Sequence, residues 1–257
     1  MNGPKQTSSQ DESIRLWNDH ATWWQDEFTD GVDPEYNEQI LPTIVDALAS
    51  SASVLDIGAG EGQVCRSLAA AGVSNVVGID PIAGQVKLAV ERASLTEHDQ
   101  SSFARSSASG LPFASGSFDA AVACLVFEHI DAIEDALAEV ARVLRRGGTF
   151  LFLLNHPLLQ TPNSGWIDDQ FVDPPEQYWR LGDYLNEQAT IEEVQKDVFI
   201  RFIHRPLSSY VNALNAAGLV IEQMQEPRPP AGYLAQSVSY QAAANIPRLL
   251  VLRCRRM

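Results

Sequence analysis

Basic residues are scarce in this sequence. Its 257 residues include 18 Lys and Arg against 33 Asp and Glu, which gives a formal net charge of −15. Proteins bind long nucleic acids largely by neutralising phosphates with basic side chains, so this balance argues against DNA or RNA as a ligand. It leaves nucleosides and proteins open as ligands.

Cysteines and long hydrophobic runs are also few. Cys65, Cys124 and Cys254 have neither metal-ligand nor disulfide spacing, so we expect no bound metal. No run approaches the roughly 18 apolar residues of a membrane-spanning helix, and Met1–Asp11 is polar, unlike a secretion signal. We therefore expect a cytoplasmic protein that binds no membrane, with a disordered N-terminus.

The chain contains one glycine-rich stretch, Val54–Gln63, which reads V-L-D-I-G-A-G-E-G-Q. An apolar run, three alternate glycines and a helical pattern from Val64 predict a strand, a turn and a helix. A ligand can lie against bare glycine backbone, and a helix N-terminus offers unpaired N–H groups. Open α/β sheets bind nucleotides at such turns. The alternative is a turn that only tightens a corner.

The spacing of these glycines bears on the kind of ligand. The dinucleotide fingerprint is G-x-G-x-x-G, but here the third glycine comes one residue early and Gln63 stands in its place. Asp56 and Glu61 flank the loop. Since carboxylates repel a pyrophosphate and attract an ammonium or a sulfonium, the pattern favours a cationic ligand.

The second predicted strand, Asn75–Asp80, ends in an acid. Asp80 lies about 20 residues beyond the loop, where a carboxylate accepts two ribose hydroxyls. This position indicates a nucleoside but does not define the rest of the ligand. A turn acid that merely precedes Pro81 is the alternative interpretation.

The remaining pattern alternates strands and helices. The apolar run Asp119–Phe127 predicts a central parallel strand, and Thr149–Leu154 predicts a fifth strand. Helices are expected at Val64–Ala71, Gln85–Ala93, Ile133–Leu144 and Leu207–Ala217, and further strands at Phe103–Ala104, Leu219–Glu226 and Leu249–Arg255.

Several short motifs follow the glycine loop in order. They are L-P-F at 111–113, S-F-D at 117–119, E-H-I at 128–130 and L-R-R-G-G-T-F-L-F at 144–152. With the loop they make the segment Val54–Leu154 resemble the class I S-adenosylmethionine-dependent methyltransferases, and motifs in series are more specific than any one. The resemblance implies an α/β, Rossmann-like, doubly wound sheet of seven mostly parallel strands with an antiparallel last strand, and S-adenosylmethionine as the cofactor.

The resemblance also implies which residues hold the cofactor. In that family the residues equivalent to Asp56, Gly58, Ala59 and Gly60 cradle the methionine part, and the equivalent of Asp80 takes the ribose. Pro81 or Ile82, together with Ala108, would enclose the adenine, and Leu125 would support the ligand from below.

One position departs from the family pattern. Where the family usually has an Asp that bonds the adenine amino group, this chain has Ser107. Two alternatives stay open: the Ser107 hydroxyl makes this bond more weakly, or the backbone of Ala108 alone holds the ring.

The segment Ser13–Tyr36 is rich in aromatic residues. Ser13–Phe28 has an apolar face at helical spacing, which predicts either a packed helix or a lid over the cofactor with His20 and Trp23 facing substrate. A second helix is expected at Ile40–Leu48, restarting at Pro42. Tyr36, just before it, is a further substrate candidate.

The segment Asn155–Arg205 interrupts the strand–helix alternation. A stretch this long without clear periodicity is usually functional or disordered, and its aromatic content argues against disorder. We interpret it as a substrate-covering insertion, although a structural role stays open for each residue. The candidate residues are Asn155, His156, Trp166, Asp168, Tyr178, Trp179 and His204.

These patterns divide the chain into four parts. Residues 1–48 form a tail and a helical lid, 49–154 the S-adenosylmethionine-binding core, 155–205 the insertion, and 206–257 a helix and the closing strands of the same domain.

The resemblance implies methyl transfer to an unidentified small molecule, by a monomer or a homodimer. A sulfonium is already activated, so the protein mainly has to align the reactants, and a general base adds a factor of about 10²–10⁴. His129 and His156 follow the fourth and fifth strands, the ends that suit base work. We take His156 as the catalytic candidate. The alternative role for His129 is to pack beside the cofactor.

Two other functions remain open. A non-catalytic S-adenosylmethionine-binding protein would have the same cofactor residues. A nicotinamide-dependent oxidoreductase is disfavoured by the early third glycine.

Overall fold

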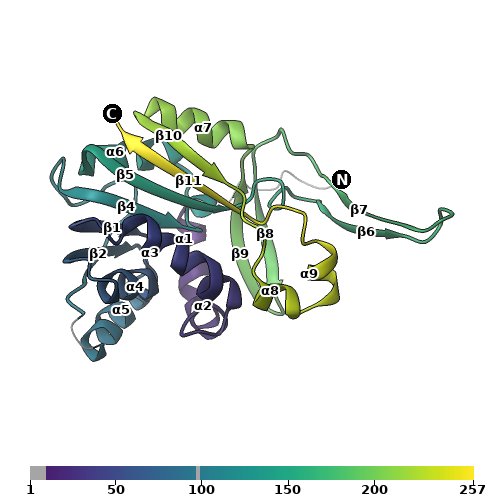
Figure 1. Ribbon diagram of the computed structural model, residues 1–257, viewed down its shortest axis with the longest axis horizontal. Coiled ribbons are helices and arrows are strands. Elements are labelled where there is room, and N and C mark those ends of the chain that lie inside the picture. Colours follow the sequence, from purple (N-terminus) through teal and green to yellow (C-terminus); the bar gives the residue numbers. More distant parts are fainter. Residues whose placement is uncertain (1–9, 97–98) are drawn as a thin grey trace.

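The computed structural model describes residues 10–96 and 99–257. The prediction of a disordered N-terminus therefore falls almost entirely outside the described residues. At the centre is a seven-stranded sheet in the order β10-β11-β5-β4-β1-β2-β3 (Figure 1). Its strands are β1 Ser53–Ile57, β2 Asn75–Asp80, β3 Ser102–Arg105, β4 Phe118–Cys124, β5 Leu144–Asn155, β10 Leu219–Gln225 and β11 Leu249–Arg256.

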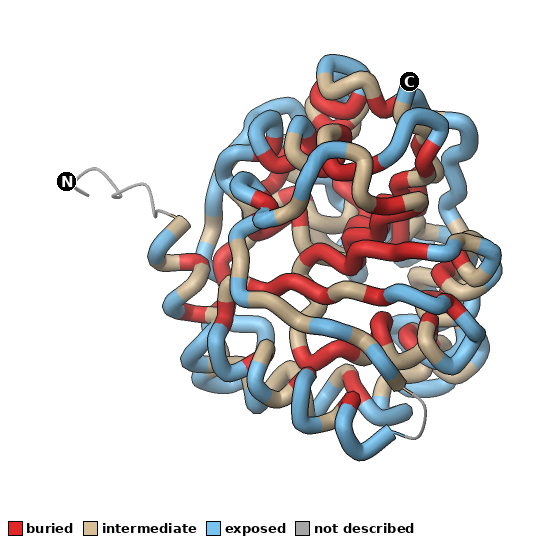
Figure 2. Tube along the Cα trace, turned by 90° about the vertical axis from the view of Figure 1, so that its left-hand side faces the viewer, coloured by how far each residue is buried: buried red, intermediate tan, exposed pale blue. Residues whose placement is uncertain are grey.

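The pairing confirms the predicted fold class. Strands β3, β2, β1, β4 and β5 are parallel to one another, while β11 is antiparallel to both β5 and β10. Helices connect β1 to β2, β2 to β3 and β4 to β5, whereas residues 106–117 connect β3 to β4 without a helix. Figure 2 shows the buried residues running along the central strands.

Successive residues of a strand point to opposite faces of the sheet, so the strands contribute side chains to two separate hydrophobic cores. Phe150 and Phe152 of β5 pack with α6 (Ile133–Val143) and α7 (Leu207–Ala216). Leu151 and Leu153 pack on the opposite face, with α3 (Leu41–Leu48) and α4 (Gln63–Ala70). The fifth helix, α5 (Ala83–Leu95), follows β2. Cys65 and Cys124 are buried in the second of these cores.

The N-terminal helix is divided, so the prediction of one helix over Ser13–Phe28 is wrong. Helix α1 (Gln10–Asp19) ends before His20, and α2 (Ala21–Phe28) starts after it. The break has a tertiary cause: α1 packs on β9 (Val198–His204), and the His20 ring accepts a hydrogen bond from the backbone of Phe199 in that strand.

Pro42 does not restart the next helix. The helical backbone is continuous from Pro34 to Leu48, with a π-helical turn, η1 (Tyr36–Ile40), directly before α3. The N–H of Leu41 bonds the Tyr36 carbonyl five residues back. Because proline has no N–H to donate, a wider turn here accommodates Pro42 without ending the helix.

The insertion consists of two β-hairpins. One pairs β6 (Gly165–Asp169) with β7 (Glu176–Arg180), and the other pairs β8 (Gln188–Gln195) with β9. Figure 1 shows the β6–β7 hairpin projecting away from the body, whereas β8–β9 lies beside the N-terminal helices. Two short helices, α8 (Ala231–Ala235) and α9 (Val238–Ala242), fill the link between β10 and β11. Of the helices in the described residues, none is long and apolar enough to cross a membrane.

Candidate functional site

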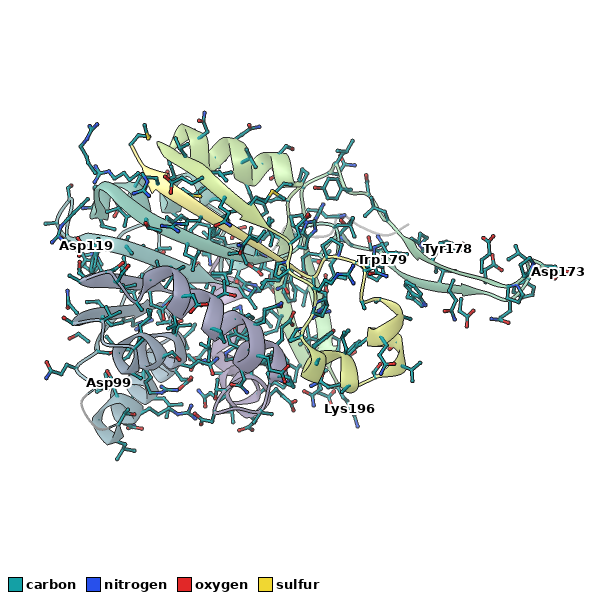
Figure 3. The ribbon with its side chains drawn as sticks, in the orientation of Figure 1. Asp99, Asp119, Asp173, Tyr178, Trp179 and Lys196 are labelled. Carbon is teal, nitrogen blue, oxygen red and sulfur yellow. The ribbon has the colours of Figure 1, made fainter. Side chains whose placement is uncertain are left out.

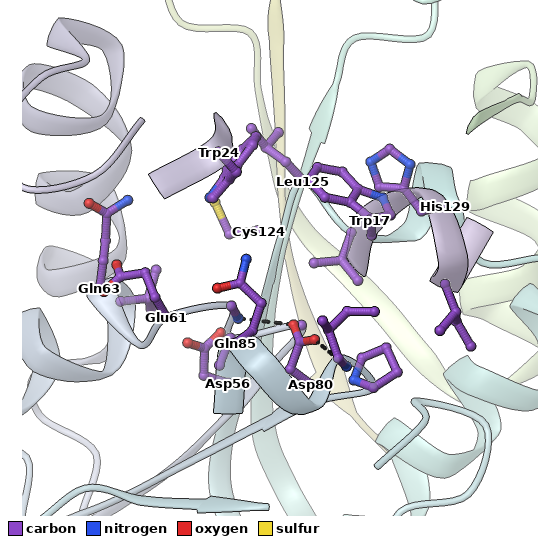
Figure 4. Close-up of a pocket in the computed structure, with 18 of the residues that line it drawn as sticks. Trp17, Trp24, Asp56, Glu61, Gln63, Asp80, Gln85, Cys124, Leu125 and His129 are labelled. Carbon is purple, nitrogen blue, oxygen red and sulfur yellow. Dashed lines mark hydrogen bonds between the residues drawn. The ribbon is translucent and has the colours of Figure 1, made fainter. Parts of the chain in front are cut away.

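A cavity lies at the carboxyl ends of β1, β2 and β4, beneath the N-terminal helices (Figure 4). This is the edge where parallel sheets bind ligands, because β1 and β4 send their connections to opposite sides. A second cavity adjoins it beside residues 106–109. Both are lined by Gly58, Pro81 and Val126, so they form the two ends of one groove.

The floor of the groove is the glycine loop after β1. Gly58, Gly60 and Gly62 all have positive φ, at +73°, +54° and +87°, a conformation that favours glycine. A Cβ at Gly58 would collide with the side chain of Val126, whereas one at Gly60 would meet no atom within 4 Å. The backbone at Gly60 thus borders open space that a ligand would fill, and the loop fits the cofactor that the sequence implies.

Asp80 is held by the same loop. One of its carboxylate oxygens accepts the Gly60 N–H at 3.0 Å and the other accepts the Ile82 N–H at 2.8 Å (Figure 4). Burial raises the pKa of Asp80 to about 6. Each oxygen retains a lone pair for a further donor, so the oriented carboxylate can accept two hydroxyls from a sugar.

Asp56 is a second buried carboxylate in the cavity. Its pKa is raised to about 7, mainly by burial and also by the charges of Asp80 and Glu61, while a hydrogen bond from the Cys65 thiol acts in the opposite direction. The distance from that sulfur to the Asp56 oxygen is 3.3 Å. A carboxylate without a nearby cation is stabilised when a positively charged ligand arrives, so Asp56 suits an ammonium or a sulfonium.

Glu61 differs from the expectation that both acids of the loop face a cation. One of its oxygens lies 2.7 Å from Arg66 and 2.6 Å from Arg92. Both arginines also reach Asp30, just after α2. The charge of Glu61 is therefore neutralised within the protein, and the network ties the N-terminal helices to the glycine loop. Asp56, by contrast, forms no ion pair with an Arg or Lys among the described residues, and the hydrogen bond to its side chain comes from the Cys65 thiol.

The four residues that the resemblance assigns to the adenine line the two cavities. Pro81 and Ile82 line the first cavity, and Ser107 and Ala108 line the second. The Ser107 hydroxyl lies 3.0 Å from that of Ser109, so it already has one partner. Both alternatives for the adenine amino group stay open.

The backbone of Leu125 has a left-handed conformation that the sequence did not indicate. Its φ is +58°, which is strained for a side chain of this size. The strain is maintained by a 3.0 Å hydrogen bond from its N–H to the Leu153 carbonyl of β5. Leu125 lines the cavity where β4 ends, and strained backbone of this kind concentrates at functional sites.

The roof of the cavity is aromatic. Trp17 of α1, Trp24 of α2 and Tyr36 of η1 all line it, which supports the lid interpretation of these helices. The other two candidates from this region lie outside. Trp23 donates its indole N–H to Gln195, and His20 is engaged by β9. Of the predicted lid residues, only Tyr36 faces the cavity.

His129 is the histidine of the cavity. Its Nδ1 lies 2.8 Å from the Arg201 carbonyl oxygen, which can only accept, so Nδ1 carries the proton and Nε2 has a free lone pair. Burial lowers the pKa of His129 to about 4, and the ring is therefore neutral near pH 7. The Trp17 ring meets it edge-on at 5.0 Å.

The other histidines and Asn155 are placed elsewhere. In His156, Nε2 lies 2.8 Å from a Glu226 oxygen and Nδ1 accepts the Leu158 N–H at 3.1 Å, so both ring nitrogens are engaged. Asn155 bonds the buried carboxylate of Glu128, and His204 bonds the Tyr184 carbonyl. None of the three sequence candidates lines either cavity.

Four candidates lie on the projecting hairpin. Trp166 pairs with Trp179, Ile167 with Tyr178, and Asp168 with Gln177 across β6–β7. Figure 3 shows Tyr178 and Trp179 on the arm, away from the body of the protein. The structure therefore brings Trp166, Asp168, Tyr178 and Trp179 together with one another, but not with the cavity.

Fold and site together define a Rossmann-like nucleotide-binding protein whose cavity suits a cationic nucleoside. A family model described as "Methyltransferase domain" matches residues 55–152. The chain belongs to the class I S-adenosylmethionine-dependent methyltransferases.

Three known proteins illustrate the similarity. O-methyltransferase rstn1 of Aspergillus nomiae is 33% identical over 131 residues, 50% of this chain and 58% of that protein. Demethylmenaquinone methyltransferase of Thermobifida fusca is 30% identical over 161 residues, 58% of this chain and 67% of that one. The crystal structure of an S-adenosylmethionine-dependent methyltransferase from Mesorhizobium loti has a TM-score of 0.71 at 24% identity, covering 84% of this chain and 96% of that one, which supports the fold. The chain thus spans little more than half the length of the first curated relative.

Proposed function

We propose that this chain transfers a methyl group from S-adenosylmethionine to a small-molecule acceptor. The observation that carries the proposal is the bare backbone of Gly60, which faces open space between two buried carboxylates, Asp56 and Asp80. That arrangement offers a negative surface for a cation and oriented acceptors for a ribose.

Each part of the cofactor has a matching set of residues. Asp56, Gly58, Ala59 and Gly60 would hold the methionine part, and Asp80 would accept the ribose hydroxyls. Pro81, Ile82, Ser107 and Ala108 would enclose the adenine, and Leu125 would support it. When bound, the cofactor supplies an electrophilic methyl carbon on a sulfonium and leaves as a neutral thioether.

The acceptor's proton requires a base when the attacking atom is a hydroxyl or a protonated nitrogen. The geometry favours His129, because its Nε2 is unprotonated and its ring lines the cavity. His156 is held by Glu226 and Leu158 outside the cavity. We therefore propose His129 as the group that takes this proton, in place of the sequence candidate His156.

Transfer of a radioactive methyl group tests the proposal. The full chain is incubated with methyl-labelled S-adenosylmethionine and an acceptor panel, and label in the product is counted. Tight cofactor binding with no transfer to any acceptor would support the alternative of a non-catalytic S-adenosylmethionine-binding protein.

A further inference from the structure

The roof aromatics form one connected wall. The Trp24 ring stacks on Phe28 with centroids 4.4 Å apart and meets Tyr36 edge-on at 6.0 Å. Trp17 meets Trp24 edge-on at 5.5 Å and His129 at 5.0 Å. Because each ring is held by a neighbour, the wall is preorganised. Adjacent rings that line the cavity are nearly perpendicular, at 76° for Trp17 and Trp24, so a flat ligand can stack on one ring and meet the next edge-on at little cost in side-chain entropy. Figure 4 shows Trp17 and Trp24 across the cavity from Asp56 and Asp80.

The charges of the cavity restrict what can lie on this wall. The described residues that line the two cavities include no Lys or Arg. Arg66 and Arg92, close to the loop, are both engaged by Glu61. An acceptor with a carboxylate or phosphate would meet Asp56 and Asp80 without a counter-charge, and like charges in a partly buried site repel strongly.

Several of the neutral polar side chains that line the cavity already have a partner. Gln10 and Ser13 donate to the His129 carbonyl, Gln63 donates to the Phe28 carbonyl, and the Tyr36 hydroxyl contacts the Cys124 thiol. The His129 ring offers Nε2 as an acceptor, as described above. Gln85 is buried, and its Oε1 accepts from Gln25 of α2 at 2.9 Å, which leaves its Nε2 as a donor without a partner among the described residues. A polyhydroxylated acceptor would leave buried hydroxyls unpaired, at a cost. A ring with a single polar group would not.

We propose that the methyl acceptor is an uncharged planar aromatic molecule that lies against Trp17 and Trp24 and presents one hydroxyl or amino group to His129. This inference rests on the proposed function and names the substrate class of the same site. An aromatic acceptor would gain ring–ring contacts with these tryptophans beyond the area that it buries.

Three matched probes test the inference by calorimetry on the full chain saturated with S-adenosylhomocysteine. They are 2-naphthol, its carboxylated form 6-hydroxy-2-naphthoate, and its saturated counterpart trans-2-decalol. We expect 2-naphthol to bind about tenfold more tightly than either of the others. The decalol lacks an aromatic ring to contact the tryptophans, and the naphthoate brings a carboxylate close to the acidic side chains of the cavity. Equal or tighter binding of the naphthoate or the decalol, or no binding of any probe, would overturn the inference.

Two tryptophans in different places supply the variants. Trp24→Ala should lower the affinity for 2-naphthol by about tenfold, and Trp24→Phe should restore most of it. Trp179→Ala should leave the affinity unchanged, because that side chain lies on the β6–β7 arm, away from the cavity. Equal effects of Trp179→Ala and Trp24→Ala would contradict the inference.

The affinity for S-adenosylhomocysteine, measured in every variant, distinguishes failure of the proposed function from failure of the proposed substrate class. If the wild-type chain does not bind S-adenosylhomocysteine, the proposed function itself fails. If it binds, but the probes do not discriminate as expected, only the substrate class fails.

Discussion

The carboxylate of Asp80 accepts the backbone N–H of Gly60 at 3.0 Å. Together with the hydrogen bonds from the Gly58 and Ala59 N–H groups to the Ile79 carbonyl, this bond holds the glycine loop that follows β1 against the end of β2. The oxygen that holds the loop is also one that we expect to accept a ribose hydroxyl. Preorganisation of this kind reduces the entropy lost on binding.

Replacing Asp80 should therefore weaken cofactor binding while preserving the fold. Asp80→Asn keeps the shape of the side chain but removes a charged acceptor, and hydrogen bonds to charged groups contribute about 1.5–3 kcal/mol, or roughly 10- to 100-fold in Kd. Calorimetric titration with S-adenosylhomocysteine measures the loss. Glu91→Gln, on the exposed side of α5, is the control and should bind normally. Unchanged affinity in Asp80→Asn would argue against the ribose role.

Alanine substitutions at Gly60 and Gly116 distinguish the effect of backbone strain on stability from the effect of an added Cβ on ligand binding. Both have positive φ, +54° and +68°, and at both a Cβ would meet nothing within 4 Å. Alanine at either position should cost about 1–2 kcal/mol of stability. Only Gly60→Ala should also weaken binding of S-adenosylhomocysteine, because only Gly60 borders the cavity. Thermal unfolding and calorimetry together give both quantities. Equal ligand affinities in the two variants would count against the loop as the binding surface.

The two histidines can be distinguished by turnover. His129→Gln should lower kcat by a factor of about 10²–10⁴, the usual contribution of a general base, with little change in the Kd of S-adenosylhomocysteine. His156→Gln should keep kcat near the wild-type value, because its ring is bonded to Glu226 outside the cavity. Loss of turnover in His156→Gln, in a protein that melts at the wild-type temperature, would restore His156 as the catalytic residue.

Cofactor binding should release protons near pH 6.5. In the free protein burial raises the pKa of Asp56 to about 7 and that of Asp80 to about 6, so at pH 6.5 Asp56 is mostly protonated. A cationic ligand favours the ionised form and lowers this pKa, so the proton leaves and affinity rises from pH 5.5 to 8. Titration with S-adenosylmethionine in buffers of different ionisation enthalpy measures the release. It should be smaller in Asp56→Asn, and the same release in both proteins would refute the assignment to Asp56.

The core of the fold could be predicted because its signals are local in sequence. The strand Ser53–Ile57 is buried at every residue, and its apolar run, the alternate glycines and the following helix all lie within about one supersecondary unit. The residues that hold the cofactor in this family are attached to those same turns. All ten of the predicted cofactor residues accordingly line one or other cavity.

What could not be predicted depends on contacts between distant segments. The preference for His129 over His156 depends on the Arg201 carbonyl, 72 residues away in sequence, which fixes the tautomer. The charge of Glu61 is compensated by Arg92, 31 residues further on. The break at His20 is set by a strand of the insertion. The strands of the two hairpins in the insertion are short and alternate only weakly between apolar and polar residues. Their sequences alone therefore do not specify which residues pair across each hairpin.

The most direct measurement is a calorimetric titration of the full chain with S-adenosylhomocysteine and, in parallel, with NAD. We expect one molecule of S-adenosylhomocysteine to bind per chain, with Asp56 and Asp80 required, and no heat of binding from NAD. Binding of NAD in place of S-adenosylhomocysteine would put a pyrophosphate on the glycine loop and contradict a site built for a cationic nucleoside.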